Sequence, residues 1–288
     1  MAERSAAQNL IPIIIAVAVG AAIAWAGSDG GVRYGAIPVF ALCGVLAFAI
    51  NWLAFIPAAL TQNEHYYDLT GGISYVTVII AAVLLSGDLD LRQTLVAAMV
   101  LAWSIRLASF LFIRISKAGK DSRFDDIKTR PLQFLLAWTL QGLWVLLTAA
   151  AVRAVITGGV RKPLGAVGFA GIAVWAIGFV IEIVADRQKS QFRANPENEG
   201  RYIDTGLWAW SRHPNYFGEF TLWWGYYLIA VSAGGWWTVL SPLLMSFLLL
   251  RVSGVALLEK DIGERRPRYQ EYIERTNAFF PGPPKRAA

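Results

Sequence analysis

The chain has 288 residues, of which 56% are hydrophobic and only 16% are charged, against about 25% charged residues in an ordinary soluble domain. A water-soluble protein of this length could not bury so much apolar surface, and the aromatic content excludes a disordered chain. The single cysteine, Cys43, excludes a disulfide scaffold and lies in an apolar run, which predicts inert packing. The net charge is +6, but the basic residues gather between apolar stretches. The composition therefore predicts an integral membrane protein that binds a lipid bilayer and no nucleic acid.

A helix needs about 20 apolar residues to cross the hydrocarbon core of a bilayer, and eight stretches approach that length. Each predicts a helix, because an open strand would leave unpaired backbone groups in lipid. In chain order they are Leu10–Ala26, Gly35–Leu60, Gly72–Ser86, Leu91–Ile115, Leu132–Val152, Leu164–Ala185, Tyr216–Val231 and Trp236–Leu258. The pair Gly71-Gly72 indicates a turn, so an irregular start is expected for the third. The predicted fold is an all-α bundle of seven to eight transmembrane helices, seven if the first stretch is discounted.

The lysines and arginines between the stretches predict the orientation. If the N-terminus is cytoplasmic, 18 basic residues fall on the cytoplasmic side and 5 on the other, while Arg106, Arg114 and Arg251 lie inside spans. We therefore expect a multi-pass protein with both termini in the cytoplasm, in the inner membrane if the cell is bacterial. The tail from Arg265 to Ala288 contains several prolines and predicts a short helix followed by an extended end.

Polar residues concentrate between Asp186 and Pro214, a segment that predicts a cytoplasmic loop. Glu182 precedes this loop, Asp186 is its first residue, and Glu219 lies on the helix that follows it. Ionisable side chains in a membrane are costly and usually functional, although Glu182 and Asp186 could simply pair with neighbouring arginines. The basic residues of the loop are Arg187, Lys189, Arg193, Arg201 and Arg212.

The densest motif is Ser211-Arg212-His213-Pro214-Asn215-Tyr216-Phe217-Gly218-Glu219. Pro214 is suited to the first position of a helix, where its missing N–H costs nothing. Asn215, Glu219 and Trp223 then share one helix face. Arg212 and His213 precede the helix, where cationic side chains and free backbone N–H groups would together bind an anion. A lone histidine is more often a structural hydrogen-bonding residue than a catalyst.

Together these residues resemble the C-terminal domain of the steroid 5α-reductase family, and look closest to its bacterial DUF1295-like branch. The resemblance covers residues 64–281 and is strongest over 182–281, above all from Glu182 to Trp223. It divides the chain into N-terminal transmembrane helices (1–60) and a catalytic membrane domain (61–288). Further similar segments are Glu64 with Tyr66–Gly71, Phe134–Trp144, Arg251, Leu258–Lys260, Arg265–Pro267 and Phe279–Pro281.

The resemblance implies that the chain uses NADPH to reduce the C=C bond of an apolar enone, with a Δ4-3-oxosteroid as the leading substrate or another lipid enone in its place. No glycine-rich nucleotide motif follows a strand, so the cofactor is expected within the helical bundle, covered by the loop. Two histidines and one cysteine do not predict a metal site. The predicted cofactor residues are Glu182, Asp186, Arg193, Arg201, Tyr202, Arg212, His213, Asn215, Tyr216, Glu219, Trp223 and Arg251.

Hydride transfer to an enone places negative charge on the carbonyl oxygen, which a hydrogen-bond donor stabilises. The resemblance implies a glutamate and a tyrosine there. The glutamate corresponds to Glu64, whose pKa an apolar site would raise so that it could stay protonated. The tyrosine position, counted from Arg106, holds Trp103, and both residues are predicted to contact the substrate. Tyr66 or Tyr67 could supply the phenol instead, or could belong to the aromatic belt at the membrane surface.

Isoprenylcysteine and phospholipid methyltransferases share this fold and bind S-adenosylmethionine. They also carry an Arg-His-Pro-x-Tyr-x-Gly element, followed later by two adjacent glutamates. Asn215, Glu219 and the single acid Glu259 favour the reductase, and an arginine-rich loop suits a polyanion. The methyltransferase is therefore the alternative function. A transporter or a non-catalytic scaffold would not need the arginine-rich loop between Asp186 and Pro214. The sequence does not predict the oligomeric state.

Overall fold

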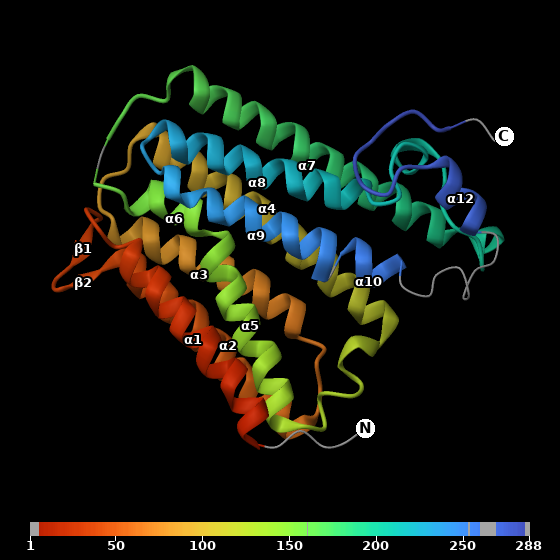
Figure 1. Cartoon of the computed structure of the whole chain (residues 1–288), viewed down its shortest axis with the longest axis horizontal. Coiled ribbons are helices and arrows are strands. Elements are labelled where there is room, and N and C mark those ends of the chain that lie inside the picture. Colours follow the sequence, from red (N-terminus) through yellow and green to blue (C-terminus); the bar gives the residue numbers. More distant parts are fainter. Residues whose placement is uncertain (1–5, 160, 253, 260–268, 286–288) are drawn as a thin grey trace. The chain divides into compact units, whose positions relative to one another are not determined.

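The computed structural model describes residues 6–159, 161–252, 254–259 and 269–285, which are mostly helical and contain almost no sheet (Figure 1). The predicted all-α fold is therefore confirmed. The chain forms two compact units. The first comprises Met1–Leu164 with Ala233–Thr238, and the second comprises Gly165–Ser232 with Val239–Ala288.

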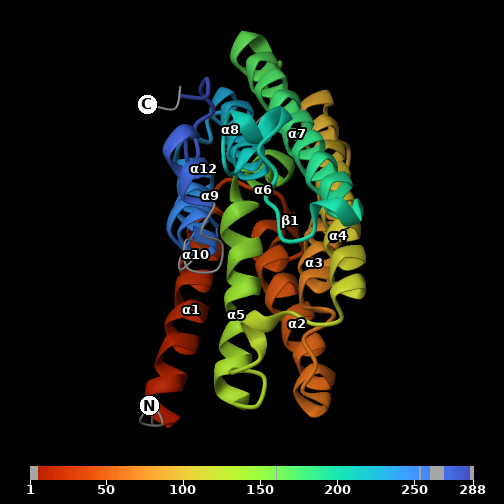
Figure 2. The ribbon, with the colours of Figure 1, turned by 90° about the vertical axis from the view of Figure 1, so that its right-hand side faces the viewer.

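The first unit is a bundle in which α2 packs against α1, α3 and α5, and α3 packs against α4 (Figures 1 and 2). A short antiparallel hairpin joins α1 to α2, with Arg33 opposite Pro38. The elements of this unit are α1 (Ala6–Ala26), β1 (Arg33–Tyr34), β2 (Ile37–Pro38), α2 (Val39–Thr61), α3 (Tyr67–Leu85), α4 (Leu91–Ala118), α5 (Pro131–Thr148) and α6 (Ala150–Thr157). The Cys43 side chain is fully buried in this unit, as predicted.

Gly71 and Gly72 lie inside α3, so the predicted turn and irregular helix start were wrong. A Cβ atom at Gly72 would overlap the Cβ atom of Ala108 on α4, and one at Gly71 would lie 2.8 Å from the Gln141 amide nitrogen on α5. These positions need glycine because neighbouring helices approach closely, which small residues allow in membrane bundles.

The second unit is organised around α7 (Gly165–Ala194) and α8 (Pro214–Ser232), which run side by side in Figures 1 and 2. Gly178 meets the backbone of Leu222, while Gly171, one heptad earlier, meets Gly225, so the two helices are antiparallel. A Cβ atom at Gly178 would lie 2.5 Å from the Leu222 nitrogen. The helix axes can approach this closely only because glycines line the contact.

Six helices of the described residues, α1 to α5 and α7, are long and apolar enough to cross a membrane. They correspond to the first six predicted spans and fit a multi-pass membrane protein. The seventh predicted span coincides with α8, which is 19 residues long but rich in tryptophan and tyrosine. The eighth is divided into short pieces, which are the 3-10 turn Trp236–Val239, α9 (Leu240–Phe247), the π-helical turn Leu248–Val252 and α10 (Val255–Glu259). Beyond these, α12 (Tyr269–Arg275) and an extended end confirm the described part of the predicted tail.

Candidate functional site

The contact between α7 and α8 brings together several of the predicted cofactor residues. Glu182 and Asp186 are buried on α7, with 2% and 5% of their surface exposed. Gly218 leaves room for the backbone of Glu182, since a Cβ atom there would lie 2.6 Å from its nitrogen. One turn further along, the Asn215 amide donates a hydrogen bond to the Asp186 carboxylate at 3.2 Å. Two predicted cofactor residues therefore contact each other directly.

The predicted loop is shorter than expected, because α7 continues to Ala194. Lys189 and Arg193 thus lie on the last turns of a helix, and Arg193 is exposed. The Lys189 ammonium group lies 4.5 Å from the centre of the Trp208 ring. The Trp208 indole also donates a hydrogen bond to the carbonyl of Ala185 at 3.0 Å. These contacts fasten the remaining loop, residues 195–213, to α7.

Helix α12 covers the same loop from its other side. Tyr202 stacks on Tyr272 with ring centres 5.1 Å apart, and Arg275 forms an ion pair with Asp204. The Tyr272 hydroxyl donates a hydrogen bond to the carbonyl of Trp208 at 2.5 Å. Tyr202 is therefore held by packing against the C-terminal segment, while Arg201 beside it is exposed.

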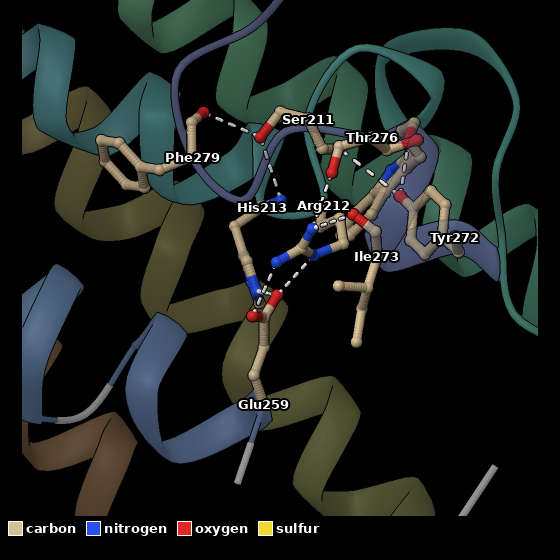
Figure 3. Close-up of polar contacts among 9 residues, drawn as sticks. Ser211, Arg212, His213, Glu259, Tyr272, Ile273, Thr276 and Phe279 are labelled. Atoms are coloured by element: carbon tan, nitrogen blue, oxygen red, sulfur yellow. Dashed lines mark hydrogen bonds and ion pairs between the residues drawn. The ribbon is translucent and has the colours of Figure 1, made fainter. Parts of the chain in front are cut away.

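Arg212 is buried, and all three of its side-chain nitrogens donate hydrogen bonds within the chain (Figure 3). Its Nε and Nη2 atoms donate to the two Glu259 carboxylate oxygens at 2.7 and 2.8 Å. Its Nη1 atom donates to the carbonyls of Thr276 and Ile273 at 2.6 and 3.1 Å. The predicted anion site before α8 is thus filled by a carboxylate of the protein, which the sequence analysis did not foresee. In the sequence, Glu259 was singled out only as the single acid that favours the reductase, and its ion pair with Arg212 was missed.

His213 shares the same carboxylate. Its Nε2 atom lies 3.0 Å from Glu259 Oε1, and its ring stacks on Tyr216 with the planes 3° apart. Burial lowers the pKa of His213, outweighing its bond to Glu259, and the Lys189 and Arg212 charges lower it further. Burial alone would raise the pKa of Glu259, but hydrogen bonds from Arg212 and His213 lower it to about 2. The site therefore holds an ionised Glu259 beside a neutral imidazole at neutral pH.

Three further predicted cofactor residues have separate surroundings. Glu219 is half-buried on α8. Trp223 is fully buried there, with its ring 5.2 Å from that of Tyr226. Arg251 is exposed in the π-helical turn Leu248–Val252, and such turns are frequent at functional sites.

Glu64, the predicted proton donor, forms an ion pair in the first unit. It is 4% exposed and accepts hydrogen bonds from the Asp121 backbone nitrogen at 2.9 Å and the Lys128 ammonium group at 3.0 Å. Lys128 also contacts Asp125 at 3.1 Å. Burial acts to raise the pKa of Glu64, but these bonds outweigh it and the pKa is lowered. The prediction of a raised pKa was wrong, because it took the site to be apolar.

The two candidate phenols, Tyr66 and Tyr67, lie in different surroundings. The Tyr67 hydroxyl donates to the carbonyl of Ala137 at 3.0 Å, and its ring packs against Phe124 and Trp138. Tyr66 is 58% exposed and stacks on Phe112. Tyr67 is thus tied to the core, whereas Tyr66 has the position expected of an aromatic residue at a membrane surface.

The two predicted substrate residues lie on α4, one turn apart. Trp103 is 2% exposed and meets Tyr75 edge-on, with ring centres 5.1 Å apart. The Arg106 guanidinium lies 5.4 Å from the centre of the Phe110 ring. In the part of the chain that the structure describes, no group of three or more histidine, cysteine, aspartate or glutamate side chains could hold a metal ion.

Fold and site together define a helical protein that fits a multi-pass membrane topology, in which the predicted cofactor residues Asp186 and Asn215 meet at one end of a close helix pair. The chain belongs to the DUF1295 family, described as a protein of unknown function, which it matches over residues 54–276. The DUF1295 part of the predicted resemblance is therefore confirmed, while the link to the steroid 5α-reductase family stays a prediction.

Two curated proteins are similar to the chain. A protein of Schizosaccharomyces pombe named as uncharacterized is 26% identical over 228 residues, which cover 66% of this chain and 63% of that protein. A "Probable O-methyltransferase" of Ustilaginoidea virens is 36% identical over 87 residues, or 30% of this chain and 29% of that protein. The chain thus spans less than two thirds of the length of either relative, and neither is named as a steroid reductase. No solved structure matches the chain.

Proposed function

We propose that the chain is a membrane enzyme that binds NADPH at the cytoplasmic ends of α7 and α8 and reduces the C=C bond of an apolar enone, with a Δ4-3-oxosteroid as the leading substrate. The observation that supports this most is the hydrogen bond between Asn215 and the buried Asp186, one helical turn after the buried Glu182. Carboxylate and amide groups suit the hydroxyls of a ribose. The exposed Arg193 and Arg201 nearby in sequence suit the cofactor phosphates, which arginine binds in forked pairs.

The bound cofactor would supply a hydride to the β-carbon of the enone, so a donor is needed at the carbonyl oxygen. Glu64 is ionised and accepts hydrogen bonds, so in this proposal it orients Lys128 and the segment around Asp121 and does not deliver a proton. Of the two phenols, the exposed Tyr66 is the better candidate donor, because the Tyr67 hydroxyl already donates to Ala137.

NADPH binding and turnover by the purified protein test the proposal. Asn215→Ala and Arg193→Ala should each weaken NADPH binding by about 1.5–3 kcal/mol, or roughly 10- to 100-fold, because a hydrogen bond to a charged group is worth that much. Arg161→Ala removes an exposed arginine that precedes α7, whereas the proposed site lies at the other end of that helix. This control variant should leave the NADPH affinity unchanged. Wild-type protein that binds no NADPH, or two site variants with wild-type affinity, would show that the site is misplaced.

Methyl transfer from S-adenosylmethionine is a second candidate, favoured by the name of the Ustilaginoidea virens relative. The same carboxylates could bind the ribose of S-adenosylmethionine. The two candidates are separated by identifying the nucleotide that co-purifies with the detergent-solubilised protein. S-adenosylmethionine or its demethylated product would favour the methyltransferase, and a nicotinamide dinucleotide would favour the reductase.

A further inference from the structure

We propose that the Arg212-His213 element recognises a ribose hydroxyl of the cofactor instead of a phosphate, and that Glu259 is the positioning residue that gives it this character. The inference rests on the proposed cofactor site at the ends of α7 and α8. It holds for either candidate cofactor, since both contain ribose. It differs from the sequence pattern, which predicts an anion site at these two residues.

Arg212 is poorly placed to take a phosphate. A guanidinium has five donor groups, and four of those of Arg212 already serve Glu259 and two backbone carbonyls (Figure 3). Its backbone nitrogen donates to the carbonyl of Asn277 at 2.9 Å. A phosphate at Arg212 would therefore have to displace a forked ion pair and would then face the negative charge of the Glu259 carboxylate. Through these bonds Arg212 joins the C-terminal segment to the start of α8.

Glu259 also decides what His213 can offer to a ligand. An ionised carboxylate is only an acceptor, so Nε2, at 3.0 Å from Oε1, must carry the ring proton. The other nitrogen of a neutral imidazole is then an acceptor. Tyr216 fixes the plane of the ring by stacking on it. His213 is thereby oriented to accept a hydrogen bond through Nδ1, and a hydroxyl group is a suitable donor.

The residues near His213 also favour a ligand that carries hydroxyl groups. Asn215, two positions after His213, contacts the Asp186 carboxylate, and Glu182 is buried one turn before Asp186 on α7. Carboxylates and a proton-accepting imidazole together favour a partner with hydroxyl donors. A ribose carries such hydroxyls, whereas a phosphate dianion would be repelled by these carboxylates.

Glu259→Gln separates the two possibilities by the sign of its effect. If Arg212 bound a phosphate, removing the competing carboxylate charge would strengthen NADPH binding. The positioning role predicts the opposite, because a Gln amide can donate to His213 and move the ring proton to Nδ1. We expect NADPH affinity to fall roughly tenfold, the size of one hydrogen bond. Glu271→Gln is the matched control, since Glu271 is an exposed acid on α12, and should change nothing.

The pH dependence provides a readout that a purely structural role would not affect. The charged groups acting on His213 are Glu259 of α10, Lys189 of α7 and Arg212 beside it. Protonation of Nδ1 removes the acceptor, so wild-type affinity should fall as the pH drops through the pKa of His213. His213→Asn places an acceptor near the Nδ1 position without this titration. It should keep affinity within a few fold and lose the acidic fall.

The experiment is a titration of the purified protein and the three variants with NADPH from pH 5 to 8, repeated with S-adenosylmethionine if that binds instead. A wild type that binds neither cofactor contradicts the proposed function. A wild type that binds one of them, with Glu259→Gln binding equally or more tightly, overturns the inference alone. Persistence of the acidic fall in His213→Asn does the same, and this variant carries the test if Glu259→Gln does not fold.

Discussion

The buried Glu64 and the partly buried Glu259 show how partners decide the ionisation of a side chain. Glu64 and Glu259 both lose most of their contact with water, which by itself raises the pKa of a carboxyl group. Each nevertheless has a lowered pKa, because cationic and N–H donors bind its carboxylate. The donors lie far away along the chain, and these reverse the direction of the shift.

We expect Glu64→Gln to lower the free energy of unfolding by about 1–3 kcal/mol, the cost of disrupting a buried hydrogen-bonded group. The pKa of Glu64 is lower than its usual value of 4.5, so the folded state binds fewer protons than the unfolded state. This contribution is complete above the usual pKa and is lost as the pH falls through the lowered pKa. The melting temperatures of wild type and variant in detergent should therefore differ at pH 7 and converge on acidification.

Asp126→Asn is the control for this comparison, because Asp126 is an exposed acid in the same segment between α4 and α5. Its melting temperature should follow the wild type over the whole pH range. Equal stability of Glu64→Gln and wild type at pH 7 would mean that the Lys128 pair contributes nothing.

The pairing of α7 and α8 depends on glycine at the element scale. Gly178 and Gly218 let each helix lie against the backbone of the other, which brings Asp186 within hydrogen-bonding distance of Asn215. Any side chain at these positions separates the helices. The site geometry is thus a consequence of close helix packing, and it should be sensitive to a single methyl group.

Gly178→Ala should destabilise the protein by about 1–3 kcal/mol, the usual cost of overpacking, and should weaken cofactor binding as well. The added Cβ atom would lie 2.5 Å from the Leu222 nitrogen and 2.6 Å from the Gly218 oxygen, and backbone atoms cannot move aside as a flexible side chain does. Ala176→Val adds volume to an exposed position of the same helix and should have little effect. Thermal unfolding and a cofactor titration of both variants measure the two effects. If Gly178→Ala and Ala176→Val had the same stability and the same cofactor affinity, the prediction would be wrong.

Membrane orientation belongs to the whole molecule, and the charge distribution predicts it. A cysteine at position 190 should be on the cytoplasmic side and one at position 162 on the opposite side, because position 162 precedes α7 and position 190 lies near the other end of that helix. The native Cys43 is fully buried, so the wild type should remain unlabelled by a membrane-impermeant thiol reagent. In intact cells Lys162→Cys should react and Ser190→Cys should not. The reverse pattern would invert the topology.

Local patterns in the sequence were sufficient for six helices that are long and apolar enough to cross a membrane, but not for the division of the eighth predicted span. Apolar stretches of adequate length predicted α1 to α5 and α7, and Pro214 marked the first residue of α8. The residues Asp186 and Asn215 were assigned to one site from a motif and a resemblance, and they do contact each other. These features depend on residues close together in the chain, or on helices joined by a short connection.

Tertiary structure alone decided which charges meet. Glu64 pairs with Lys128, 64 positions later, and Arg212 with Glu259, 47 positions later. Neither spacing has a period that a helix or strand imposes, so no local pattern indicates the pairs. Composition and hydropathy determined a helical membrane protein with a polar cluster at one end of a helix pair. The ionisation of that cluster depends on long-range packing, because an ion pair is a property of three-dimensional distance.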